Sequence, residues 1–235
     1  MLLSLSFLIG GNDLSRHIYP MAASMPCPPV VIDVSDCPDA KLWAETAKAL
    51  VVEWYPKLTQ LLATDGRDPL TGGKKGEAFK APAEIKLVFK KTLNVPAYAS
   101  GGEITINGDW IAKHPDDLGM VVHELTHVIQ QYPGGRNKPG WLVEGIADYI
   151  RWWRYEPELH AGPGRTKVNA STAKYTDAYR TTAVWLAWVS RKYDMRLVPA
   201  LDKAMRDRED PMPLFEKVTG KNADDLWKEF VATLG

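Results

Sequence analysis

The sequence of 235 residues contains few cysteines, no excess of charge of either sign and no long hydrophobic run beyond its first residues. Only Cys27 and Cys37 are present, which excludes a framework of several disulfides, and neither has the spacing of a zinc ligand. The segment between them predicts a strand, and a fully extended connection would put them roughly 30 Å apart, whereas a disulfide needs Cα atoms within about 7 Å. A sharp reversal near Cys37 would be needed, so a disulfide and free thiols both stay open.

The charges balance, because 29 basic and 29 acidic residues give a formal net charge of zero. Such a balance gives no reason to expect nucleic acid or an anionic membrane as the main partner. With 45% hydrophobic and 25% charged residues, the composition is that of an ordinary soluble globular protein with a substantial core. No internal repeat or low-complexity tract divides the chain, and residues 29–235 are interpreted as a single domain.

The first residues, MLLSLSFLIGG, form a short apolar run. It is too short to span a bilayer and is similar to the hydrophobic part of a signal peptide, although the basic start is missing. Ala22, Ala23 and Ser24 offer a cleavage site at an unusual distance. Residues 1–28 are therefore interpreted as a possible signal or leader segment, and we expect a secreted or extracytoplasmic protein without stable membrane insertion. A misassigned start codon or a disordered leader is the alternative.

The most informative motif is the pentapeptide HELTH, which begins at His123. On a helix, His123 and His127 are four positions apart, so both imidazoles project from one face and can bind one zinc ion. Glu124 lies beside them with its carboxylate free to act on a zinc-bound water. Apolar residues flank the pair on both sides, so the helix is expected to be buried, where unpaired imidazoles would be costly.

A third ligand is expected on a second helix, which follows the turn-forming stretch PGGRNKPG. Glu144 is the candidate ligand, and Asp148 lies four residues later on the same face. Two histidines, one glutamate, an open fourth position and a spare carboxylate are typical of a hydrolytic zinc site. Asp148 is expected to accept a hydrogen bond from the distal nitrogen of one histidine ligand, which would fix its tautomer. A solvated position or a salt bridge to Arg151 or Arg154 is the alternative.

Hydrophobic periodicity and turn signals predict the remaining elements. Strands are expected at Val30–Val34, Ala83–Lys90 and Gly101–Asn107, and helices at Asp39–Leu62, Trp141–Arg154, Thr172–Tyr193, Val198–Arg206, Pro213–Val218 and Ala223–Leu234, the last capped by Asn222. Pro115 and Asp116 are expected to open the metal helix. Strands come first and helices finish the chain, which predicts an α+β fold with a small N-terminal β-sheet over the HELTH helix and a helical C-terminal half. The cleft is expected between the two halves.

The motifs resemble the zincin superfamily, and a glutamate third ligand resembles its gluzincin branch. HELTH is the pentapeptide of thermolysin-like enzymes, and the spacing of Glu144 and Asp148 matches theirs. Four segments, MVVHELTHVIQ, PGWLVEGIADYIRW, YTDAYRTTAVWLAWV and DLWKEF, are similar to the plant and bacterial basic secretory protein family of peptidases. This resemblance covers nearly the whole chain from about Pro29 and implies a zincin-like fold and one zinc ion per chain. The chain departs from the family name in being neutral, which weakens any analogy with plant defence.

The expected function is therefore a zinc-dependent metallopeptidase that acts on a peptide or protein substrate. Glu124 would take a proton from the attacking water and pass it to the departing amine. A second donor to the oxyanion is expected, and the sequence offers Tyr175 and Tyr179, which would share a face of one helix, or His160 in a loop. A structural role is the ordinary alternative for each tyrosine, a lone loop histidine such as His160 is usually only a surface residue, and His17 and His114 have no supporting pattern.

Substrate binding is assigned to the strand that precedes the metal helix. Gly102, Glu103, Ile104 and Thr105 are predicted to form an edge of the cleft and to pair with an extended substrate through main-chain hydrogen bonds. An ordinary edge strand without a ligand is the alternative. Trp152 and Trp153 follow the second site helix and either line a subsite or pack in the core.

Two other functions use the same residues. A zinc-dependent hydrolase of another amide or of a cell-wall peptide would need the same site, because the site defines attack by water and not the substrate. A non-catalytic secreted binding module could keep zinc for stability. Glu124 argues against this second alternative, because a structural zinc site needs no general base and is normally closed by a fourth protein ligand.

Overall fold

A four-stranded sheet forms one half of the protein. The computed structural model describes residues 22–74, 76, 78–133, 138–157 and 167–234. The strands β1 (Val30–Asp33), β2 (Ile85–Lys90), β3 (Ala97–Ser100) and β4 (Glu103–Asn107) lie in the order β1-β2-β4-β3. The first three strands in that order are parallel, and β3 is antiparallel to β4 at the edge of the sheet.

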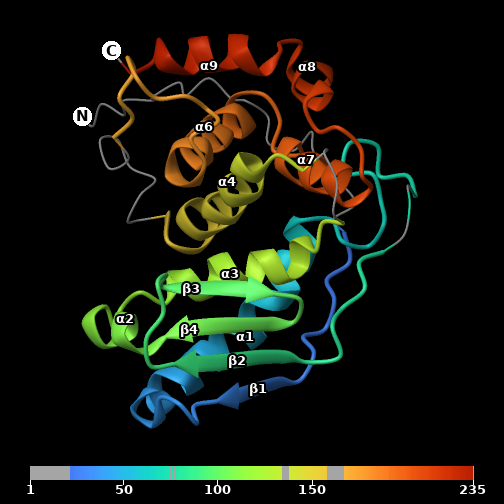
Figure 1. Ribbon diagram of the computed structural model, residues 1–235. Helices are drawn as coiled ribbons and strands as arrows, with labels where there is room; N and C mark the ends of the chain where they lie inside the picture. The colour runs from blue at the N-terminus through green and yellow to red at the C-terminus, as the bar shows by residue number, and fades with distance from the viewer. Residues whose placement is uncertain (1–21, 75, 77, 134–137, 158–166, 235) are drawn as a thin grey trace, which may run out of the picture.

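Two helices cover one face of this sheet, α1 (Lys41–Leu61) and α3 (Gly119–Gln130) (Figure 1). All residues of α3 are buried except His127, which is partly exposed. The apolar residues of this helix form one side of it, and the opposite side carries His123, Glu124 and His127. Asn107 ends β4 and caps the short helix α2 (Gly108–Lys113), because its side chain accepts hydrogen bonds from the first N–H groups of that helix.

Helices form the other half of the protein (Figure 1). The helix α4 (Gly140–Ile150) continues into a π-helical turn, η3 (Arg151–Tyr155), and packs against α6 (Tyr179–Lys192). The helices α7 (Leu197–Arg206), α8 (Pro213–Thr219) and α9 (Ala223–Val231) complete this half. The predicted α+β class, with the sheet early in the chain and helices late, is confirmed.

Two helix starts differ from the predictions. The helix that carries HELTH begins at Gly119 and not at Pro115. The helix predicted from Thr172 begins at Tyr179, because Ala178 before it has φ 64° and ψ −173° and Tyr179 has φ 46°. Neither residue has the negative φ of a right-handed helix, so the preceding segment cannot continue into α6. The strand β3 and the helix α2 were not predicted.

The N-terminal predictions fall mostly outside the described residues. Of the possible leader, residues 1–21 lie outside them, as do His17 and His160. The remaining residues of this segment pack against α1, because the N–H of Met25 donates a hydrogen bond to Oγ1 of Thr59 in that helix (3.0 Å). Cys27 and Cys37 are free thiols. Among the described residues, no helix combines the length and the apolar character that a membrane span requires.

Candidate functional site

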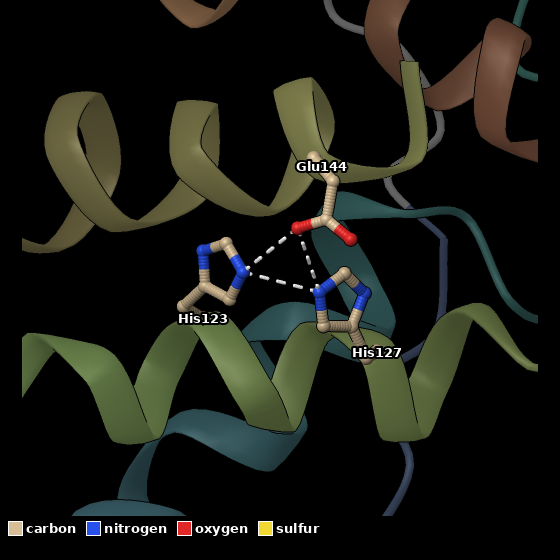
Figure 2. Close-up of side chains that lie close together, drawn as sticks. All are labelled: His123, His127 and Glu144. Atoms are coloured by element: carbon tan, nitrogen blue, oxygen red, sulfur yellow. Dashed lines mark hydrogen bonds and ion pairs between the residues drawn. The ribbon is translucent and has the colours of Figure 1, made fainter. Parts of the chain in front are cut away.

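Three side chains from two helices meet in the space between those helices (Figure 2). The helix α3 presents His123 and His127 from adjacent turns, and α4 presents Glu144 toward them. The two Nε2 atoms are 3.1 Å apart, and Oε2 of Glu144 lies 3.3 Å from Nε2 of His123 and 3.4 Å from Nε2 of His127. The spacing of four residues in HELTH explains why both rings face α4.

These three atoms fit one tetrahedral metal ion. Ligand atoms placed 2.0–2.1 Å from a tetrahedral zinc ion are separated from one another by roughly 3.3 Å. The three observed separations lie close to that value, and two imidazole nitrogens with one carboxylate oxygen form a ligand set that suits zinc. The residues present therefore fit a zinc ion and leave a fourth position for a non-protein ligand.

The histidines and carboxylates of the cluster shift one another's pKa values. Burial alone would lower the pKa of His123, but hydrogen bonds to Asp148 and Glu144 outweigh it and raise that pKa to about 9. Burial alone would raise the pKa of Glu144, but hydrogen bonds from His123 and His127 lower it to about 2. The cluster thus keeps a negative carboxylate beside the imidazoles, as a cation site requires.

The Nδ1 atom of each histidine ring contacts a second side chain. Nδ1 of His123 lies 2.8 Å from Oδ1 of Asp148, which is buried in α4. Nδ1 of His127 lies 2.7 Å from Oε1 of Gln130. Both contacts lie on the side of the ring away from the ligand nitrogen, so they leave Nε2 free to bind a metal. Gln130 was missed in the sequence, although its position three residues after His127 puts both on one helical face.

Glu124 lies beside the cluster and is not one of its ligands. Its side chain is buried in α3 and faces the cleft. Burial raises its pKa, and the charges of His123 and His127 together with a hydrogen bond from the backbone of Ala99 act against that shift. A buried carboxylate with a raised pKa is suited to accept a proton and to release it again near neutral pH.

An open cleft of about 970 Å³ leads to the cluster. One wall is the segment from Val95 to Ala99, which contains most of β3, and the other walls come from α3, α4 and the first turn of α6. The cleft therefore lies between the sheet and the helical half, as the order of elements predicts. Trp152 lines it, whereas Trp153 is a core residue that does not border it.

The prediction that Gly102, Glu103, Ile104 and Thr105 form the substrate-binding edge is wrong. Strand β4 is a central strand, with β2 bonded on one side and β3 on the other, so its backbone cannot pair with a substrate. The exposed edge that borders the cleft is β3. The short sequence AYAS of this strand does not show the alternation of a longer strand, which is why it was missed.

The two candidate tyrosines lie in different places. The ring of Tyr179 is stacked with that of His123, with ring centroids 6.4 Å apart, and the side chain is 55% exposed in the cleft. The charge of Glu144 raises its pKa. Tyr175 instead donates a hydrogen bond to Oδ1 of Asp224 (3.0 Å) and does not border the cleft. The predicted shared helical face is wrong, because α6 begins only at Tyr179.

The sequence matches the family BSP, described as a peptidase of plants and bacteria, over residues 46–230. The matched segment contains the three candidate ligands, Glu124 and Tyr179. No curated protein and no solved structure matches the chain.

Proposed function

The chain belongs to the BSP family, the peptidases of plants and bacteria, and from this premise we propose that it is a zinc-dependent metallopeptidase. The observation that carries the proposal is the cluster of His123, His127 and Glu144, whose ligand atoms all lie within 4.8 Å of one another at an open cleft. His123, His127 and Glu144 would hold the ion. Zinc, when bound, supplies a Lewis acid that activates water and polarises the peptide carbonyl.

Glu124 is proposed as the general base. Its carboxylate lies beside the ligands without belonging to them, so it is free to take a proton from the attacking water. The same carboxyl group then gives the proton to the nitrogen of the departing amine. The raised pKa that burial causes favours the first step, because it makes the Glu124 carboxylate a stronger base.

Tyr179 is proposed as the second donor to the oxyanion. Its ring is stacked with that of His123 and its side chain is exposed in the cleft, so the hydroxyl can reach a substrate carbonyl held near the ligands. An extended peptide would add to the free edge of β3 by main-chain hydrogen bonds. Together these groups would supply a base, an oxyanion donor and a backbone partner for the substrate within one cleft.

Three substitutions test the assignment on an unfolded protein such as casein. Glu124→Gln should keep zinc content and folding but abolish cleavage, because the amide accepts no proton. Tyr179→Phe should lower kcat by about 10²–10³ with little change in KM, the size typical of a lost oxyanion donor. Tyr175→Phe is the matched control, since it removes a hydroxyl that points to Asp224, and kcat should not change. Cleavage by Glu124→Gln, or equal losses in the two tyrosine variants, would contradict these roles.

A further inference from the structure

Gln130, the last residue of α3, contacts both helices that carry the candidate ligands. Its Oε1 lies 2.7 Å from Nδ1 of His127, and its Nε2 donates to the carbonyl of Val143 in α4 (3.1 Å). Val143 directly precedes Glu144. Gln130 is 2% exposed, so water does not compete freely for these two bonds.

The backbone carbonyl of Val143 fixes the orientation of the Gln130 side-chain amide. A backbone carbonyl can only accept a hydrogen bond, so the group that faces it must be the NH₂ of the amide. The oxygen of Gln130 then faces His127 and can only accept. His127 must therefore carry a proton on Nδ1, so its neutral form is the Nδ1–H tautomer, in which Nε2 is free to bind a metal.

The segment after Gln130 is also anchored. Gln131 ends α3 in the left-handed conformation, with φ 33°. The hydroxyl of Tyr132 then donates to Oδ1 of Asp202 (2.7 Å), a fully buried residue of α7. Asp202 is paired with Arg206 on the same helix. Contacts on both sides thus fix Gln130, and its amide cannot turn without breaking a buried bond.

We propose that Gln130 is a positioning residue that sets the tautomer of His127 and the separation of α3 from α4, and thereby the zinc affinity of the cluster. The proposal rests on the proposed zinc site but not on peptide hydrolysis. One amide links a ligand of α3 to the backbone beside the ligand of α4. Its loss should therefore loosen two of the three ligands at once.

The substitution Gln130→Met keeps the length of the side chain and removes its hydrogen bonds to His127, Val143 and Tyr132. It should weaken zinc binding by about 10- to 100-fold, the usual effect of losing an outer partner of a metal ligand. Gln130→Glu keeps an oxygen for His127 but offers no donor to Val143, so its zinc affinity should lie between wild type and Gln130→Met. Thr126→Val is the matched control, because it removes another buried bond of α3, from Thr126 to the carbonyl of Val122 (2.8 Å).

The experiment measures zinc dissociation constants by competition with a chromophoric chelator, and the tautomer of His127 by histidine ¹H–¹⁵N NMR on zinc-free protein. The expected result is an Nδ1–H tautomer in wild type and Thr126→Val, and its loss together with weaker zinc binding in Gln130→Met. An unchanged tautomer and an unchanged dissociation constant in Gln130→Met would overturn the proposal, as would an equal loss in Thr126→Val. A wild type that binds no zinc would overturn the proposed function, and the NMR arm would still decide the tautomer.

Discussion

Gly145 lies beside the third ligand and allows α4 to approach α6 closely. A Cβ atom at this position would lie 2.7 Å from Cβ of Thr182 and closer still to its Cγ2. Carbon atoms in contact are normally 3.5–4.0 Å apart, so Gly145→Ala must separate the two helices by about 1 Å. The adjacent Glu144 would move with α4, although zinc sites tolerate only about 0.2 Å in ligand distance.

The expected magnitude follows from two opposed effects. Overpacking costs about 1–3 kcal/mol, and replacing glycine by alanine within a helix stabilises by up to about 1 kcal/mol. Gly145→Ala should therefore lower the free energy of unfolding by about 1–2 kcal/mol. It should also weaken zinc binding at least tenfold, because the 3.3 Å and 3.4 Å separations of Glu144 from the histidines can no longer be kept. Urea unfolding with excess zinc and chelator competition measure the two effects.

Two further variants make the test specific. Gly140→Ala lies in the same helix, and its Cβ would meet no atom within 4 Å, so stability should stay the same or rise slightly. Adding Thr182→Gly to Gly145→Ala removes the atoms in conflict, and zinc affinity should recover although a glycine now weakens α6. Wild-type zinc affinity and stability in Gly145→Ala alone would refute the close packing of α4 on α6.

Two other predictions concern stability. After zinc is stripped, the raised pKa of His123 should add on the order of 3 kcal/mol to the free energy of unfolding. This contribution should be fully present below about pH 6.5 and should be lost as pH rises through about 9. Urea unfolding between pH 6 and pH 10 measures this loss, which excess zinc should abolish. Ala178→Gly should raise the free energy of unfolding by about 1 kcal/mol, because glycine adopts φ 64° without strain but loses more entropy on folding.

Each of these two predictions has a control and an outcome that would contradict it. His123→Gln removes the titrating group, and a pH dependence identical to that of wild type would show that another residue causes it. Ala187→Gly lies in the interior of α6 and should lower stability by about 1 kcal/mol or more. If Ala178→Gly were destabilising to the same extent, the backbone at Ala178 would not be strained.

The parts of the site that depend on local spacing were predictable from the sequence. The period of the α-helix puts His123 and His127 on one face, and the same rule pairs Glu144 with Asp148. Gln130 obeys this rule as well and could have been found by asking what lies three residues after His127. The α+β class follows from the order of strand and helix patterns along the chain.

The parts that depend on tertiary arrangement were not predictable in this way. Strand β4 has the clear alternation of a half-buried strand, but only the pairing of β3 beside it shows that β4 is central. Nothing in the hydrophobic pattern marks Ala178 as a residue with positive φ, so the helix was expected to run through Tyr175. That single backbone conformation separates Tyr175, bonded to Asp224, from Tyr179, which faces the cleft.

The most direct test of the central claim is metal content by elemental analysis of wild type and His127→Ala, together with casein cleavage. The account predicts about one zinc ion per chain in wild type, loss of zinc in the variant, and cleavage that a chelator stops. Zinc without cleavage would contradict the peptidase assignment while leaving the metal site in place. No bound zinc, even after reconstitution, would contradict the claim that His123, His127 and Glu144 form a metal centre.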